Sequence, residues 1–222
     1  MKRGKKTILP TRRRAALRRL LRGLIVLVLA NHFFSVGLLL PIQAIHKAVE
    51  RGGAVGTRVI AREWTPELYA THLLYLTGSE TATVLADTHL GILGWESGFE
   101  CTLDCTSGAP LYAGERSMSR DGREDSLHYY FGRVDDPDIA AVAVSIQAET
   151  YIDGRPVRRE VRRLEVPELL ERKGYRYFLV SALKPEWERE DAVLKTVAVA
   201  LDGNGREVGA WDIHNASYSH YG

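Results

Sequence analysis

The chain has 222 residues, of which 45% are hydrophobic and 26% are charged. This composition excludes a disordered chain, and the length leaves room for one folded domain plus a targeting or anchoring segment. The net charge of +2 is divided unevenly, because ten lysines and arginines precede Gly23 and the first acidic residue is Glu50. The remaining 20 basic and 28 acidic residues give the rest of the chain a charge of −8.

The N-terminal region predicts a membrane-inserted segment. Residues 1–22 form a basic cytoplasmic tail, and Gly23 to Leu40 is an 18-residue stretch without a formal charge. A helix of that length spans about 27 Å, close to the hydrocarbon thickness of a bilayer. Because cationic flanks resist translocation, the ten cations place the N-terminus in the cytoplasm and the larger part outside the cell membrane. We therefore expect the lipid bilayer, and no nucleic acid, as a partner of residues 1–41.

Two questions about this segment stay open from the sequence. The apolar run of 23–41 is longer than a secretory signal core, which favours a retained signal-anchor, but Ala44 offers a small residue for cleavage. Asn31 and His32 lie within the run, and such polar residues can mark a contact between membrane helices.

The rest of the chain predicts a mainly β fold, an antiparallel sandwich or open barrel. Residues 42–54 form a short juxtamembrane helix that ends at Gly52-Gly53, and residues 55–222 form the extracytoplasmic β-rich domain. The clearest hairpin surrounds Asp202-Gly203-Asn204-Gly205, whose glycines and asparagine tolerate positive φ. Short strands are expected at 55–64, 83–87, 90–95, 127–134, 139–147, 157–164, 176–182, 193–201 and 206–213.

The two cysteines, Cys101 and Cys105, are expected to form a disulfide in an exported domain. A bridge across so short a loop would fix a local bend and would contribute little chain entropy. No second cysteine pair or nearby His-x-His motif completes a structural metal site.

Few residues suggest catalysis. Asp87 and His89 share one face of a predicted strand, where a carboxylate could orient a histidine or help to bind a metal. The acidic run Asp135-Asp136-Pro137-Asp138 is interpreted as a capped turn, because it matches no calcium-loop pattern. A solvated strand face explains the arginine stripe at Arg155, Arg158, Arg159, Arg162 and Arg163, although contact with an acidic polymer is the alternative. We accordingly predict no catalytic, metal or cofactor site.

The segments Phe131–Val144 (FGRVDDPDIAAVAV) and Val197–Asp212 (VAVALDGNGREVGAWD) resemble parts of small uncharacterised exported proteins of Gram-positive bacteria. Together they cover about a seventh of the chain. The resemblance implies a membrane-anchored or lipid-anchored extracytoplasmic domain without assigned activity, in which Asp136, Pro137 and Ile139 are structural.

These observations predict a single-pass membrane protein whose exported domain binds a partner, such as an envelope protein or a cell-wall polymer, without catalysis. One alternative is an envelope hydrolase that uses Asp87, His89 and either Asp135 or Asp138. The other is a sensor or regulatory protein that acts through its membrane helix. Convergence of the acidic side chains and His89 on one point would favour the hydrolase.

Overall fold

A computed structural model gives the fold of this protein. It describes residues 11–34, 40–51, 54, 56–64, 72–91, 94–119, 126–152, 155–183, 193–215 and 217–218.

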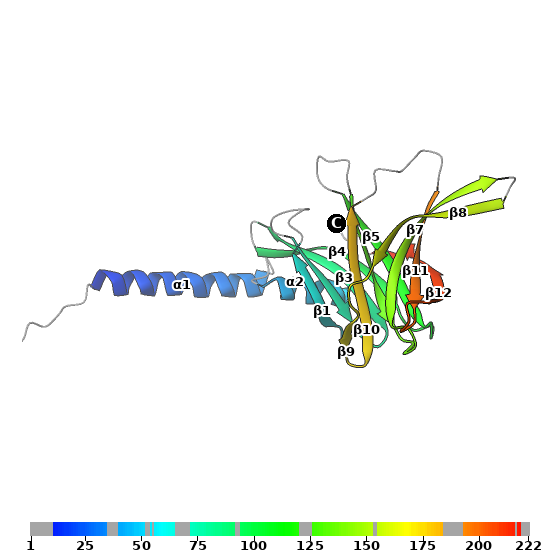
Figure 1. Ribbon diagram of the computed structural model, residues 1–222. Coiled ribbons are helices and arrows are strands. Elements are labelled where there is room, and N and C mark those ends of the chain that lie inside the picture. Colours follow the sequence, from blue (N-terminus) through cyan, green and yellow to red (C-terminus); the bar gives the residue numbers. More distant parts are fainter. Residues whose placement is uncertain are drawn as a thin grey trace, which may run out of the picture.

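Two helices precede the sheets (Figure 1). Helix α1 (Thr11–Phe34) projects away from the domain, whereas α2 (Pro41–Arg51) packs on it through Ile45 and Val49. The short helix expected after the apolar run therefore exists. The expected membrane segment includes residues 35–39, which lie outside the described part of the chain. None of the helices described is long and apolar enough to cross a membrane.

The β-strands form three sheets, each built on four antiparallel strands. Sheet A contains, in order, β1 (Arg58–Trp64), β2 (Leu73–Gly78), β3 (Ala82–Gly91) and β4 (Gly94–Asp104), with the two-residue strand β14 (Ser217–Tyr218) at its edge. Sheet B contains β5 (Leu111–Ser119), β6 (Ser126–Val134), β10 (Tyr175–Leu183) and β9 (Leu170–Arg172). Strand β13 (His214–Asn215) adds a short parallel pairing to β5.

Sheet C contains β12 (Glu207–Asp212), β11 (Val193–Leu201), β7 (Ala141–Ile152) and β8 (Arg155–Glu165). The mainly β, antiparallel prediction is confirmed. In the part of the chain described, the three sheets do not close into a barrel.

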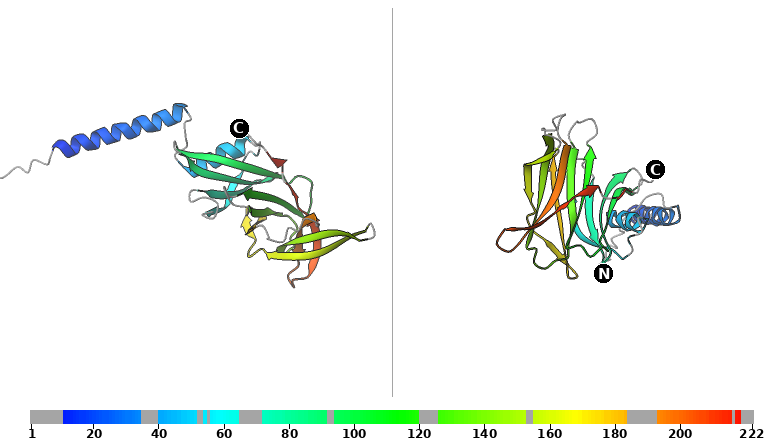
Figure 2. Two further views of the ribbon diagram at one scale, coloured as in Figure 1. Left: turned by 90° about the horizontal axis from the view of Figure 1, so that it is seen from above. Right: turned by 90° about the vertical axis from the view of Figure 1, so that its right-hand side faces the viewer.

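Sheet B is the middle layer, because its two faces pack on different partners (Figure 2). Residues two apart on a strand point to the same face. Tyr129 and Phe131 of β6 pack against Leu85 of sheet A, whereas Tyr130 packs against Val144 and Ile146 of sheet C. The outer face of sheet A is covered by α2, so the layers run α2, sheet A, sheet B and sheet C.

A buried arginine joins sheet A to sheet B. Arg133 of β6 is 2% exposed, and its Nε and Nη2 donate to the two carboxylate oxygens of Asp135 at 2.7 and 2.6 Å. Its remaining N–H groups donate to the carbonyl oxygens of Ser79 and Glu80, in the β2–β3 turn, and of Cys105, just after β4, at 3.1, 2.7 and 2.9 Å. All five guanidinium donors are thus used.

The acidic run after β6 is a capped turn, as expected. Asp136 accepts a hydrogen bond from the backbone N–H of Asp138 at 2.9 Å, and Arg176 donates to the carbonyl oxygens of Asp136 and Ile139. The β11–β12 hairpin is also confirmed. There the Asp202 carboxylate accepts two backbone N–H groups, which lower its pKa, and Gly205 has a φ of +75°.

Cys101 and Cys105 are free thiols, so the predicted disulfide is wrong. The segment expected to bend is the straight end of β4, where Cys101 enters the core between sheets A and B. Four residues of extended strand separate Cα atoms by about 13 Å, whereas a disulfide needs less than about 7 Å. Instead, Cys105 Sγ lies 3.4 Å from the Thr83 hydroxyl.

The arginine stripe lies on an exposed strand. Strand β8 forms with β7 a hairpin that extends beyond the body of the domain (Figure 1), and both of its faces are solvated. We expected only the arginine face to be wet, but Val157 and Val161 are also exposed. The reason is that the hairpin extends past the rest of the domain, so no other described layer covers the face on which Val157 and Val161 lie.

Burial leads us to expect that both cysteine thiols are chemically unreactive in the folded protein. It raises the pKa of Cys101 to about 11 and also raises that of Cys105, so little thiolate exists near neutral pH. We expect an aromatic disulfide reagent to react with neither thiol in the native chain. After denaturation without a reductant, it should detect two thiols per chain. A denatured count of zero would mean that the cysteines are bridged and would contradict the structure.

Candidate metal centre

Asp87 and His89 lie on β3 and face the layer between sheets A and B. Leu85, two residues before Asp87, is part of the core on that face. The Asp87 side chain is almost fully buried, whereas that of His89 is 35% exposed, so the pair lies where the core meets solvent. Both residues are close to the β3–β4 turn, at the end of the domain nearest α1 (Figures 1 and 2).

His72, just before β2, joins this pair. Leu73 is opposite Thr88 in the register of β2 and β3, which brings His72 beside His89. Its Nδ1 lies 3.1 Å from Asp87 Oδ2, and its ring stacks on that of His89 with centroids 5.2 Å apart and planes inclined by 15°. The ligand atoms of all three side chains lie within 4.8 Å of one another. We call His72, Asp87 and His89 the His–Asp–His cluster.

A β-bulge orients the Asp87 carboxylate. On β4 the register shifts so that Gly98 and Phe99 together oppose Asp87. The backbone N–H of Phe99 donates to Asp87 Oδ1 at 2.5 Å, while Oδ2 faces His72. A Cβ atom on Gly98 would lie 2.2 Å from Asp87 Oδ1, so glycine provides the space for the carboxylate. The bulge thus fixes one carboxylate oxygen and turns the other toward His72, as second-shell donors orient the ligands of a metal site.

The donor set suits a first-row transition ion. Imidazole nitrogens prefer zinc, copper, iron or nickel, and two histidines with one carboxylate leave coordination positions open. The Nδ1 atom of His89 is buried and makes no hydrogen bond within the described residues. Donors about 2.1 Å from one ion lie at most about 4.2 Å apart, so the cluster would have to contract by roughly half an ångström. Glu96, whose Oε2 is 3.8 Å from His89 Nε2, lies beside the cluster.

The structure separates the other residues of the hydrolase hypothesis from this cluster. Asp135 is held by Arg133, which contacts the Ser79–Glu80 turn at the opposite end of β3. Asp87 lies five residues from Ala82, the residue that closes that turn, which corresponds to about 17 Å along the strand. Asp87 and His89 therefore meet, but neither Asp135 nor the exposed turn residue Asp138 joins them. His72 could not be predicted as part of this site, because nothing near it in the chain suggests a partner 15 residues away.

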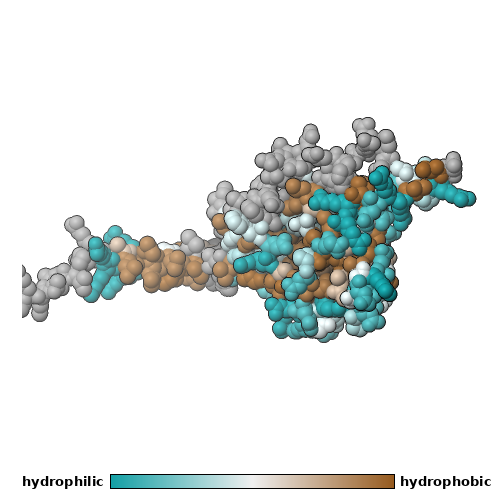
Figure 3. Space-filling view, viewed as in Figure 1, coloured by the Kyte–Doolittle hydropathy of each residue, from teal (hydrophilic) through white to brown (hydrophobic). Residues whose placement is uncertain are grey.

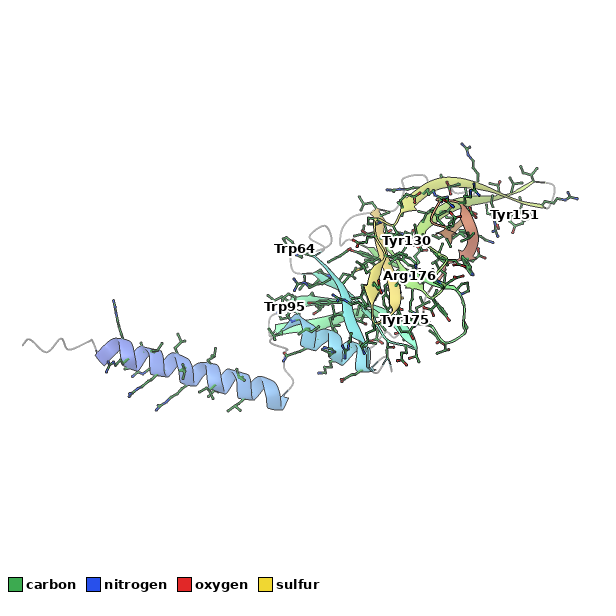
Figure 4. All side chains as sticks on the ribbon, turned by 60° about the horizontal axis from the view of Figure 1, so that its bottom comes forward. Trp64, Trp95, Tyr130, Tyr151, Tyr175 and Arg176 are labelled. Atoms are coloured by element: carbon green, nitrogen blue, oxygen red, sulfur yellow. The ribbon has the colours of Figure 1, made fainter. Side chains whose placement is uncertain are left out.

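The cavity of about 700 Å³ near the Ser79–Thr81 turn does not include the cluster. It is bounded by β1, by the β9–β10 turn at Lys173 and by Tyr175 and Tyr177. Figure 4 shows Tyr175 and Arg176 on β10, while Trp64 and Trp95 lie at the other end of sheet A. The candidate site is the His–Asp–His cluster, where ligand atoms converge, and not this cavity, because the volume of a cavity alone does not indicate what it binds.

Comparisons with known proteins offer no relative from which a role could be transferred. The chain matches no protein-family model, no curated protein and no solved structure.

Gly98→Ala should disturb the carboxylate of the cluster. The added methyl group would displace Asp87 from the Phe99 N–H, so we expect the free energy of unfolding to fall by about 1–2 kcal/mol, measured by urea denaturation. Gly203→Ala is the matched control, because a Cβ there meets nothing within 4 Å. Equal destabilisation of both variants would mean that the bulge does not position Asp87.

Proposed function

We propose that this protein is an exported, membrane-anchored domain that binds a divalent transition-metal ion at the His–Asp–His cluster. The observation that carries this proposal is the convergence of three ligand side chains within 4.8 Å, two from β3 and one from the residue just before β2. Like the role expected from the sequence, this one is binding without catalysis, but it departs from the expectation that the chain has no metal site.

The location of the cluster supports reversible binding. His72 and His89 are partly exposed, so an ion can reach the site, whereas the buried Asp87 supplies a fixed negative charge. Partial burial strengthens the attraction between that carboxylate and a cation relative to full exposure to water. Three protein ligands leave at least one position for water or for a group on a partner.

Membrane anchoring rests on residues 23–40 and on the exposed apolar side chains of α1. Leu20, Leu21, Leu24, Val26 and Leu29 are each about half exposed or more. Figure 3 shows the resulting hydrophobic band, which has no protein partner among the described residues. A bilayer would remove this surface from water, and the preceding arginines would stay in the cytoplasm. The cluster would then lie at the end of the domain closest to the membrane.

Zinc binding tests the proposed site. We expect the full chain in detergent to bind one Zn²⁺ by isothermal titration calorimetry, and His72→Ala, Asp87→Asn and His89→Ala each to weaken binding at least about tenfold. Affinity should also fall on acidification, since protons compete with the ion for imidazole nitrogens.

His46→Ala is the matched control, because His46 is exposed on α2 and lies outside the cluster. Its zinc affinity should equal that of the wild type. Wild-type affinity in Asp87→Asn and His89→Ala would contradict the proposed site.

Alkaline carbonate extraction tests the anchor. The wild-type chain should remain in the membrane pellet, and a C-terminal tag should be cleaved by protease added to intact, wall-stripped cells. Val26→Arg combined with Leu29→Arg should release the protein, because each arginine costs about 2.5–3.5 kcal/mol at the centre of a membrane helix. Leu17→Arg, outside the apolar run, is the control. A wild-type chain in the supernatant would overturn the anchor but would leave the metal site untouched.

A further inference from the structure

A second polar cluster lies on the opposite side of sheet B. Ser126 and His128 are two residues apart on β6 and share the face of Tyr130, which packs on sheet C. Glu115 of β5 is opposite Tyr130 in the register and completes the group. Because this face lies on the other side of sheet B from the His–Asp–His cluster, the two groups of residues are independent.

The three side chains form a continuous hydrogen-bonded chain. His128 Nδ1 lies 2.6 Å from Glu115 Oε1, and His128 Nε2 lies 3.1 Å from Ser126 Oγ. An ionised carboxylate only accepts hydrogen bonds, so Nδ1 carries the proton and Nε2 of the neutral ring accepts the serine hydroxyl. The side chains of His128 and Glu115 are 19% and 17% exposed, so the group is not sealed from solvent.

This order of groups is the arrangement that activates a serine. A carboxylate fixes the imidazole in the correct tautomer, and the imidazole takes the hydroxyl proton as the oxygen attacks. Packing does not require polar side chains at these partly buried positions, because replacing a buried ion pair by apolar residues of similar size is often neutral or stabilising.

We propose that Ser126 is a nucleophile for acyl transfer, with His128 as general base and Glu115 as the positioning residue. Ser126 Oγ bonds to the carbonyl carbon of an ester while its proton moves to His128 Nε2. The bond to the leaving alcohol then breaks, and the alcohol takes the proton from Nε2. Water hydrolyses the acyl-serine by the same proton transfers in reverse and restores the hydroxyl. The half-buried Leu164, Val180 and Ile213 near Tyr130 favour an acyl group with an apolar body.

Charged and titratable groups from the neighbouring strands set the pH dependence of this site. The ring of Tyr130 stacks on that of His128 with centroids 6.3 Å apart. Burial and the Glu115 charge raise the pKa of Tyr130, while Thr196 of β11 and Arg162 of β8 act in the opposite direction. Tyr130 therefore stays neutral near pH 7, and Arg162 and Glu115 are the charged side chains that act on it. The nucleophile loses its base when His128 gains a proton.

The test is covalent labelling of the purified full chain with a fluorophosphonate probe, which forms a bond between Ser126 Oγ and phosphorus and releases fluoride. Mass spectrometry of the digested wild type should place the adduct on Ser126. Labelling should vanish in Ser126→Ala, fall at least about 100-fold in His128→Gln, fall by a smaller factor in Glu115→Gln and decrease on acidification.

Ser145→Ala is the matched control. Ser145 is a buried serine whose hydroxyl donates to Glu160 and which has no histidine partner among the described residues, so this variant should label like the wild type. Circular dichroism verifies that each variant is folded. The absence of an adduct on Ser126 in the folded wild type, or an unchanged labelling rate in His128→Gln, overturns the proposal. Labelling that survives a metal chelator supports a site separate from the His–Asp–His cluster.

Discussion

The structure depends on one buried guanidinium. Arg133 reaches from sheet B into the end of sheet A and saturates all five of its N–H groups, two on a carboxylate and three on main-chain carbonyls. Tyr112 and Tyr175 lie against its planar faces, with ring centroids 5.2 and 4.5 Å from the guanidinium carbon. Burial is the largest single influence and would lower the pKa of Arg133, but the hydrogen bonds and charge of Asp135, together with Cys105 and Tyr177, raise it overall. A lysine has three donors and no planar fork, so it could not replace these contacts.

Arg133 joins sheets A and B at one end. The two other groups of polar side chains lie elsewhere in the layers. The His–Asp–His cluster occupies the far end of sheet A, where a bulge interrupts the regular pairing of β3 with β4. The Ser126–His128–Glu115 chain occupies the other face of sheet B. Strand β6 makes this division possible, because successive residues such as Tyr129 and Tyr130 enter two different cores.

Local patterns in the sequence predicted local structure well. The glycines around Asn204 specified the β11–β12 hairpin, and Pro137 with its flanking aspartates specified a capped turn. Strand β5 was missed, since Leu111–Ser119 mixes glycine and charged residues without clear alternation. His72 and Glu115 were missed for a different reason: their partners are distant in sequence, and only strand register brings them close. The disulfide was predicted wrongly because spacing says nothing about whether the intervening residues are extended.

The projecting β7–β8 hairpin has a consequence for how molecules of this protein meet. Strand β8 is an edge strand of sheet C. The unpaired main-chain N–H and C=O groups of an edge strand can form hydrogen bonds with a strand of another molecule. Arg158 and Arg163 are neutralised by Glu149 and Glu165, but Arg155 and Arg159 are solvated and carry no carboxylate partner among the described residues. Two such edges approaching each other would bring like charges together, so these arginines oppose the growth of a continuous sheet from one copy into the next.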